Sequence, residues 1–213
     1  MRNMLKCLFS AIRFGSLLCG ICVVLLLSGC SKQLTRSHAL DLITHSENRK
    51  ATVSFPIVVG QYALEYPADP YPAYVALQSF GLLAIKDNPP ITAWYDVTKT
   101  ISAKKAVDLT NQGQSQASKE TDLFGNIQWS FITAEDREVV AVTGIGVEGE
   151  TEATAQFTWK WKLSTIGQAL AKAGCSPDGK TAGQGKDTNP LREGTAEFKL
   201  YDDGWRLEQI EFL

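Results

Sequence analysis

Residues 151–163, TEATAQFTWKWKL, alternate apolar and polar side chains over their whole length. Successive side chains of a β-strand point to opposite faces, so this spacing puts every apolar residue on one face. The apolar set comprises Ala153, Ala155, Phe157, Trp159, Trp161 and Leu163. One buried face and one hydrated face are typical of antiparallel sheets, and the stretch therefore predicts a long antiparallel strand.

Strands are expected on both sides of this one. Apolar residues of one parity predict an interrupted strand over about 94–109 and a second over 139–147, with a polar loop at 110–122 between them. Another strand is expected at 196–200, because Ala196, Phe198 and Leu200 share a parity. The sheet therefore has at least four strands.

The end of the chain predicts a β-hairpin. Asp203-Gly204 supplies the positive φ that a tight hairpin requires, and it stands between two alternating segments. The apolar parity of the final strand changes after Leu207, which predicts a β-bulge near Glu208-Gln209.

Three short helices are predicted at 34–46, 72–80 and 166–173. Together with the strands they predict an α+β fold, in which N-terminal helices pack on a curved antiparallel sheet of four or more strands. Residues 38–213 are long enough for a single α+β domain. The alternative division is a small helical subdomain at 38–90 followed by the sheet at 91–213.

The N-terminal segment is typical of a secretory signal. Arg2, Lys6 and Arg13 precede an uncharged stretch at 14–27, which is shorter than the roughly 20 apolar residues of a membrane span. The stretch ends in Leu27-Ser28-Gly29-Cys30, which resembles the lipobox of bacterial lipoproteins.

The lipobox resemblance implies a processed, lipid-anchored protein. Residues 1–29 would be cleaved, Cys30 would carry a diacylglyceryl thioether and usually an added acyl chain, and residues 30–37 would form a lipidated tether to the membrane. Ser31, in place of the Asp that often retains lipoproteins in the inner membrane, favours the outer membrane facing the periplasm. The alternative is an uncleaved N-terminal anchor.

Charge and cysteine content restrict the function further. Residues 1–29 hold three of the 21 basic residues and none of the 23 acidic ones, which leaves 18 basic residues against 23 acidic ones and a net charge of −5. An acidic protein is a poor ligand for nucleic acid, so no nucleic-acid partner is expected. After processing, Cys30 carries lipid and only Cys175 remains, so no intramolecular disulfide is expected.

Two groups of residues are candidate sites. His38, Asp41 and His45 are spaced to share one side of a helix and are weak candidates for a Zn²⁺ or Cu²⁺ site, the alternative being a solvated helix edge. Phe157, Trp159 and Trp161 are candidates to line a ligand pocket, the alternative being plain core. No catalytic constellation is recognised, and no cofactor is expected.

Two stretches carry a further resemblance. Residues 72–109 and 139–213 resemble a loosely defined group of uncharacterised bacterial lipoproteins, and Asp203-Gly204-Trp205-Arg206 is similar to the final hairpin of cystatin-like and NTF2-like domains. We therefore expect a non-enzymatic envelope module that binds a protein or cell-wall partner. The alternative is a small-molecule-binding or enzymatic domain that uses a cavity between sheet and helices.

Overall fold

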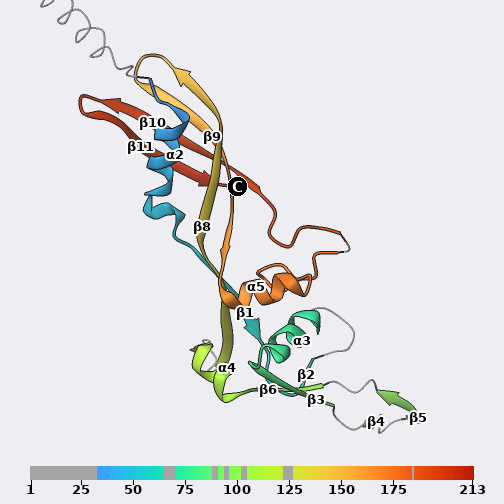
Figure 1. The fold of residues 1–213 in the computed structure, drawn as a ribbon. Helices are drawn as coiled ribbons and strands as arrows, with labels where there is room; N and C mark the ends of the chain where they lie inside the picture. The colour runs from blue at the N-terminus through green and yellow to red at the C-terminus, as the bar shows by residue number, and fades with distance from the viewer. Residues whose placement is uncertain are drawn as a thin grey trace, which may run out of the picture.

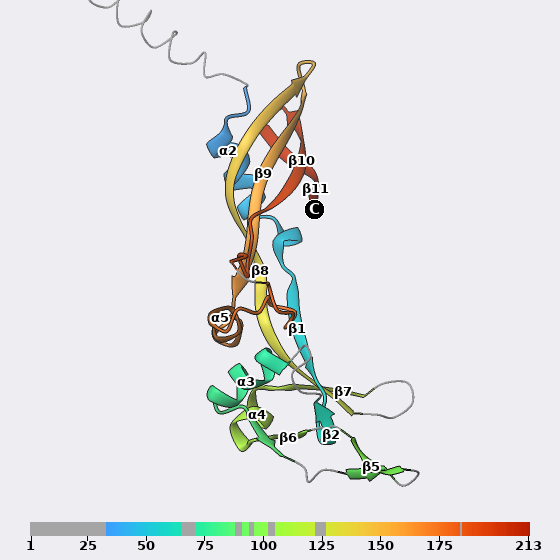
Figure 2. The same ribbon diagram turned by 90° about the vertical axis from the view of Figure 1, so that its right-hand side faces the viewer.

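The molecule is elongated and is built along one long strand (Figures 1 and 2). The computed structural model describes residues 33–64, 71–87, 91–93, 96–101, 105–121, 127–183 and 185–213. Strand β8 (Ile127–Glu148) has 22 residues, and a rise of about 3.3 Å per residue makes it roughly 70 Å long. The hairpin that joins β8 to β9 lies at one end of the molecule, and helices α3 and α4 lie at the other.

The main sheet has six antiparallel strands in the order β1-β8-β9-β10-β11, with β7 also paired to β8. Besides β8, the strands are β1 (Thr52–Ile57), β7 (Ser118–Thr121), β9 (Glu152–Leu163), β10 (Arg192–Tyr201) and β11 (Gly204–Phe212). Both β1 and β7 pair with the first part of β8, whereas β9 pairs with residues 134–148. Strand β8 therefore connects the part of the sheet that contains β1 and β7 with the part that contains β9, β10 and β11.

The remaining elements are short. Two small sheets contain β2 (Gly60–Leu64), β6 (Lys105–Leu109) and β3 (Leu83–Lys86), and β4 (Ile91–Ala93) with β5 (Asp96–Ile101). The helices are α2 (Arg36–Thr44), α3 (Tyr71–Ser79), α4 (Asn111–Gln116) and α5 (Thr165–Lys172), with a 3-10 turn at Glu47–Arg49.

One hydrophobic core, which we call the sheet core, fills the curved part of the main sheet. Strand β9 contributes Phe157 and Trp159, which are 1% and 2% exposed, and both rings meet the Phe212 ring edge-on with centroids 5.4 Å apart. Ala39 and Ile43 of α2 are buried in the same core. The apolar face of residues 153–159 is therefore buried, as the alternation predicts.

A second core, which we call the helix core, lies at the other end of β8. It joins Tyr74 and Leu77 of α3, Leu170 of α5, and Phe55 and Phe131 of the main sheet. The Tyr74 hydroxyl accepts a hydrogen bond of 2.8 Å from the Val58 amide. Burial raises the pKa of Tyr74, although this hydrogen bond opposes the rise. Position 90 is the boundary in the alternative division into a helical subdomain and a sheet. Residues before and after this boundary contribute to the helix core.

The α+β class and the curved antiparallel sheet of more than four strands are confirmed. The order of the helices differs from the expectation, because among the described helices only α2 precedes the strands, while α3 and α4 stand between strands and α5 follows β9. The Asp203-Gly204 hairpin is confirmed, with φ of 132° at Gly204. The bulge is confirmed too, since Glu197 pairs with Gln209 and Phe198 with Leu207, which leaves Glu208 as the extra residue.

The structure corrects the expected loop at 110–122 and the expected start of the strand at 139–147. The polar loop expected at 110–122 contains helix α4 and strand β7, because Thr110 caps the helix and β7 pairs with β8. The strand expected at 139–147 begins at Ile127. The interrupted strand expected at 94–109 corresponds to β5 and β6.

Arg137 of β8 stacks on three aromatic rings beside the sheet core. Its guanidinium carbon lies 4.5 Å from the centroid of the Phe212 ring and 5.5 Å from that of Trp161, and its Nη1 donates to the Asn48 carbonyl at 2.9 Å. The third ring is Trp159, at 5.6 Å. Burial lowers the pKa of Arg137.

We expect Arg137→Lys to lower the free energy of unfolding by about 1–2 kcal/mol, because a compact ammonium cannot stack on several rings as the planar guanidinium does. Urea unfolding followed by tryptophan fluorescence measures the loss. The control is Arg36→Lys, at an exposed position of α2, where we expect a change within about 0.5 kcal/mol. Equal losses in the two variants would contradict a role for the stacking.

Candidate functional site

An apolar groove of about 680 Å³ runs between helices α3 and α5. The two helices lie next to each other at the α3 end of the molecule (Figures 1 and 2). The groove is lined by residues of two segments that lie far apart in the sequence. Helix α3 and the residue after it contribute Tyr71, Pro72, Val75, Ala76, Ser79 and Phe80, and helix α5 and the residue after it contribute Thr165, Gln168, Ala169, Lys172 and Ala173. The groove is therefore built almost wholly by the outer faces of two helices.

Helix α3 is apolar on both of its sides. Ala73, Tyr74 and Leu77 point into the helix core, and Tyr71–Ser79 contains no charged residue. On the outer side, Val75 and Phe80 are each 37% exposed. Exposed apolar side chains that lie together are typical of contact surfaces, so this side of α3 is a candidate contact surface, although Gln78 and Ser79 of the same helix are polar and exposed.

Helix α5 is amphipathic and supplies the polar groups of the groove. Ile166 and Leu170 are buried, whereas Gln168 and Lys172 are exposed. Lys172 is the only charged residue in the lining given above. An ammonium in the last turn of a helix is favoured by the helix dipole, so Lys172 is stable where it stands and is available to an anionic group.

The first turn of α5 is fixed to strand β8 by Ser164. The Ser164 hydroxyl accepts a hydrogen bond from the Gly167 amide at 3.1 Å and donates one to the Ile132 carbonyl at 2.8 Å. The Ser164 amide donates to the Thr133 carbonyl at 3.0 Å. Gly167 lies so close to the same carbonyl that a Cβ atom built on it would be 1.9 Å from the oxygen. The absence of a side chain at Gly167 thus lets α5 sit against β8.

The same arrangement occurs at α4. The Thr110 hydroxyl accepts from the Gly113 amide at 2.9 Å and donates to the Gly81 carbonyl at 2.7 Å, and a Cβ atom on Gly113 would lie 2.0 Å from the Leu82 oxygen. The two sequences share the pattern Leu-Ser/Thr-x-x-Gly-Gln, at residues 109–114 and 163–168. This repeated pattern in the sequence therefore indicates close packing of each helix, through its glycine, against a neighbouring backbone carbonyl.

The candidate pocket residues on β9 lie away from the groove, in and beside the sheet core. Phe157 and Trp159 are buried, and the Trp159 indole donates to the Glu193 carbonyl at 2.9 Å. Trp161 is half-buried, with its ring 5.2 Å from that of Trp159. These contacts are those of core residues.

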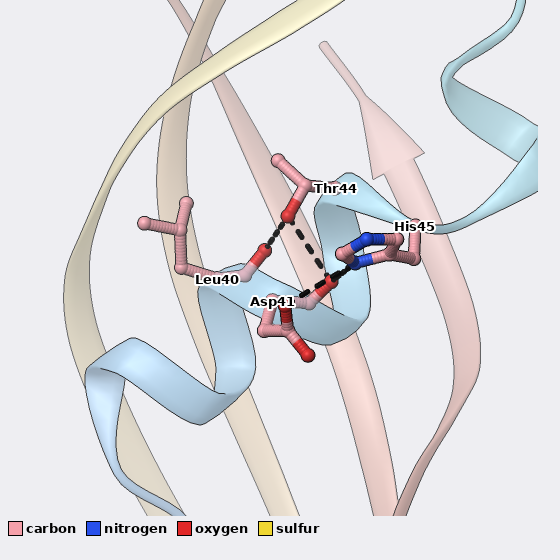
Figure 3. Close-up of polar contacts among 4 residues, drawn as sticks. All are labelled: Leu40, Asp41, Thr44 and His45. Carbon is pink, nitrogen blue, oxygen red and sulfur yellow. Dashed lines mark hydrogen bonds and ion pairs between the residues drawn. The ribbon is translucent and has the colours of Figure 1, made fainter.

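The candidate metal ligands on α2 only partly meet. His45 Nδ1 lies 3.2 Å from Asp41 Oδ1 and 2.8 Å from the Asp41 carbonyl oxygen, and Thr44 also donates to this carbonyl (Figure 3). All three side chains of the set, His38 included, are exposed. Within the part of the chain that the structure describes, no group of three or more His, Cys, Asp or Glu residues could hold a metal ion.

Of Cys30 and Cys175, the structure describes only Cys175. Cys30 and the whole of segment 1–29 lie outside the described residues. Cys175 is fully buried in the helix core, with its Sγ 3.9 Å from the Ala173 carbonyl oxygen. Among the described residues, no helix is both long and apolar enough to span a membrane.

No protein-family model, curated protein or solved structure matches the chain.

Proposed function

We propose that this protein is a lipoprotein of the bacterial envelope, anchored through lipid on Cys30, and that it acts as a non-enzymatic binding module for a protein partner. The α3–α5 groove is the observation that carries the proposal. Its lining is mainly apolar, and an apolar surface suits a protein better than a polar cell-wall glycan. Among the described residues that line it there is no acidic residue, histidine or cysteine to act beside its hydroxyl groups as a general base.

The geometry supports presentation of the groove to a partner away from the membrane. The first described residues and α2 lie at the end of the molecule where β8 and β9 are joined, and helices α3 and α5, which line the groove, lie toward the opposite end (Figure 1). With the lipid on Cys30, three residues before the described chain begins, the groove would stand tens of ångströms from the bilayer, since a strand of this length spans roughly 70 Å. We place the anchor in the outer membrane, facing the periplasm, on the strength of Ser31.

The second candidate function is binding of a small molecule in the same groove. A volume of about 680 Å³ falls within the roughly 300–1,000 Å³ of small-molecule sites. Such sites usually enclose their ligand and direct several polar groups at it. The open apolar groove with its one charged residue fits a protein partner better.

Anchoring is tested by replacing Cys30. We expect cells grown with an alkyne fatty acid to label the wild-type protein, which then sediments with membranes, and we expect no label on Cys30→Ser, because serine offers no thiol for the thioether. The control is Cys175→Ala, which should keep the label. An unlabelled wild-type protein, or a labelled Cys30→Ser variant, would overturn the lipid anchor.

A further inference from the structure

We infer that the α3–α5 groove receives an amphipathic helix of a soluble partner protein, with its apolar side chains in the groove and an acidic residue paired with Lys172. The inference deepens the proposed binding function and rests on it. It names the secondary structure of the ligand, the polarity of its buried face and the sign of its charge.

The length of the groove walls suits a helical ligand. On α3 the lining positions 72, 75, 76 and 79 recur every three or four residues, and on α5 the positions 165, 168, 169 and 172 do the same. Each wall is therefore one complete helical face, about 12–13 Å long at 1.5 Å per residue. Two turns of a third helix match this length, with side chains at i, i+3, i+4 and i+7 directed into the groove.

The lining leaves room for a helix backbone. Ala76, Ser79, Ala169 and Ala173 have short side chains, while Val75 and Phe80 are the larger apolar groups. Packed helices have axes about 8–10 Å apart, and short side chains are what allow such a close approach. An apolar side chain that enters the groove is removed from water, which favours binding.

The charge of the groove selects an acidic ligand. Lys172 is exposed and is the one charged side chain among the described residues of the lining. A carboxylate on the incoming helix would gain a charged hydrogen bond there, whereas a lysine or arginine would be repelled in a partly apolar setting.

A second copy of this chain is a poor occupant. Among the described helices, α2 buries Ala39 and Ile43 in the sheet core and α4 contains no large apolar residue. Helices α3 and α5 are the groove walls themselves. They expose apolar side chains of their own, but neither contains an acidic residue that could pair with Lys172. Among the described helices, none therefore combines an unoccupied apolar face with an acidic residue that would suit the groove of another copy.

The test is site-specific photo-crosslinking of the full-length protein in cells. Benzoylphenylalanine replaces Val75 or Ser79 in the groove, and Val140, which is 43% exposed on β8, serves as the control position. We expect protein adducts from positions 75 and 79 and not from 140. Mass spectrometry should map the crosslinked segment of the partner to an amphipathic helix with an acidic residue beside its apolar face.

The Lys172 variants test the charge. Combined with the crosslinker at position 75, Lys172→Glu should lower the adduct yield about tenfold, because repulsion replaces an ion pair, and Lys172→Arg should retain it. No protein adduct, an adduct only with lipid or with a second copy, a crosslinked segment that is not an amphipathic helix, or a yield insensitive to Lys172→Glu would overturn the inference.

Fatty-acid labelling of the same cells separates this inference from the proposed anchor. A labelled protein without groove adducts would refute the helix ligand and leave the anchor standing. An unlabelled protein with the expected adducts would refute the anchor and leave the helix ligand standing. Urea unfolding of the Lys172 variants, whose exposed side chain should contribute little to stability, confirms that each variant is folded.

Discussion

Replacing Gly167 by alanine is expected to lower the free energy of unfolding by about 3 kcal/mol, although the same change usually stabilises a helix. Alanine gains up to about 1 kcal/mol over glycine within a helix. Here its Cβ atom would lie 1.9 Å from the Thr133 carbonyl oxygen, a distance at which the backbone must move. The cost of moving α5 outweighs the gain in helix propensity.

The loss has a specific structural origin. To relieve the contact, α5 must shift from β8 by more than 1 Å, which is about the shortfall from a normal van der Waals distance. The shift would break the hydrogen bond between the Ser164 amide and the Thr133 carbonyl. It would also displace the α5 wall of the groove, so adducts from position 75 should fall together with stability.

Gly144→Ala is the control, because Gly144 lies on β8, the strand against which α5 packs, and its added Cβ would meet only Gln156 Oε1, at an ordinary 3.6 Å. We expect the free energy of unfolding to change by no more than about 0.5 kcal/mol. Urea unfolding of the two variants measures the difference. Similar values for Gly167→Ala and Gly144→Ala would mean that α5 is not held against β8 as described.

Local sequence patterns were enough to predict the curved half of the sheet. Strand β9 alternates strictly, and the hairpin and its bulge follow from Asp203-Gly204 and from the change in parity after Leu207. Each of these features depends on neighbours in the sequence. This is why residues 152–163 and the bulge at Glu208 were predicted close to their observed positions.

The first half of β8 could not be predicted in this way. Its pairing shifts register between Ala134 and Arg137, and Asp136 between them has φ of 60°, so the alternation is interrupted. Thr133 looks like an exposed polar residue, yet it is fully buried and donates to the carbonyls of Val53 and Pro177. Such partners are distant in the sequence and leave no periodic trace.

The groove was missed for a similar reason. Both helices that form it were expected close to their observed positions, but their contact is tertiary and no local pattern records it. One signal pointed toward it without revealing it, namely the lack of charge in Tyr71–Ser79. The repeated Leu-Ser/Thr-x-x-Gly-Gln pattern concerns how α4 and α5 pack on their neighbours. Helix α4 was missed because Asn111–Gln116 contains no apolar residue, so only its cap and Gly113 indicate it.

The sheet core offers a second large effect. We expect Phe157→Ala to lower the free energy of unfolding by about 3–5 kcal/mol, because truncation removes a buried ring and leaves a cavity that its neighbours fill only in part. Phe157 is 1% exposed, and its ring packs edge-on against Phe212. The Phe157 ring also covers Gly194, where an added Cβ would lie 2.4 Å from it, so the surroundings are closely packed.

Phe80→Ala is the comparison that links this prediction to function. Phe80 is 37% exposed in the groove, so its truncation should cost less than about 1 kcal/mol of stability while it weakens crosslinking from position 75. Phe157→Ala at a temperature where it remains folded should keep those adducts, because its ring lies in the sheet core, away from the groove.

If instead Phe157→Ala lowers the free energy of unfolding by less than about 1 kcal/mol, the ring is not part of the core. The ligand pocket considered for Phe157, Trp159 and Trp161 then becomes the better interpretation. The two phenylalanines thus separate the residues that stabilise the fold from those that contact a partner.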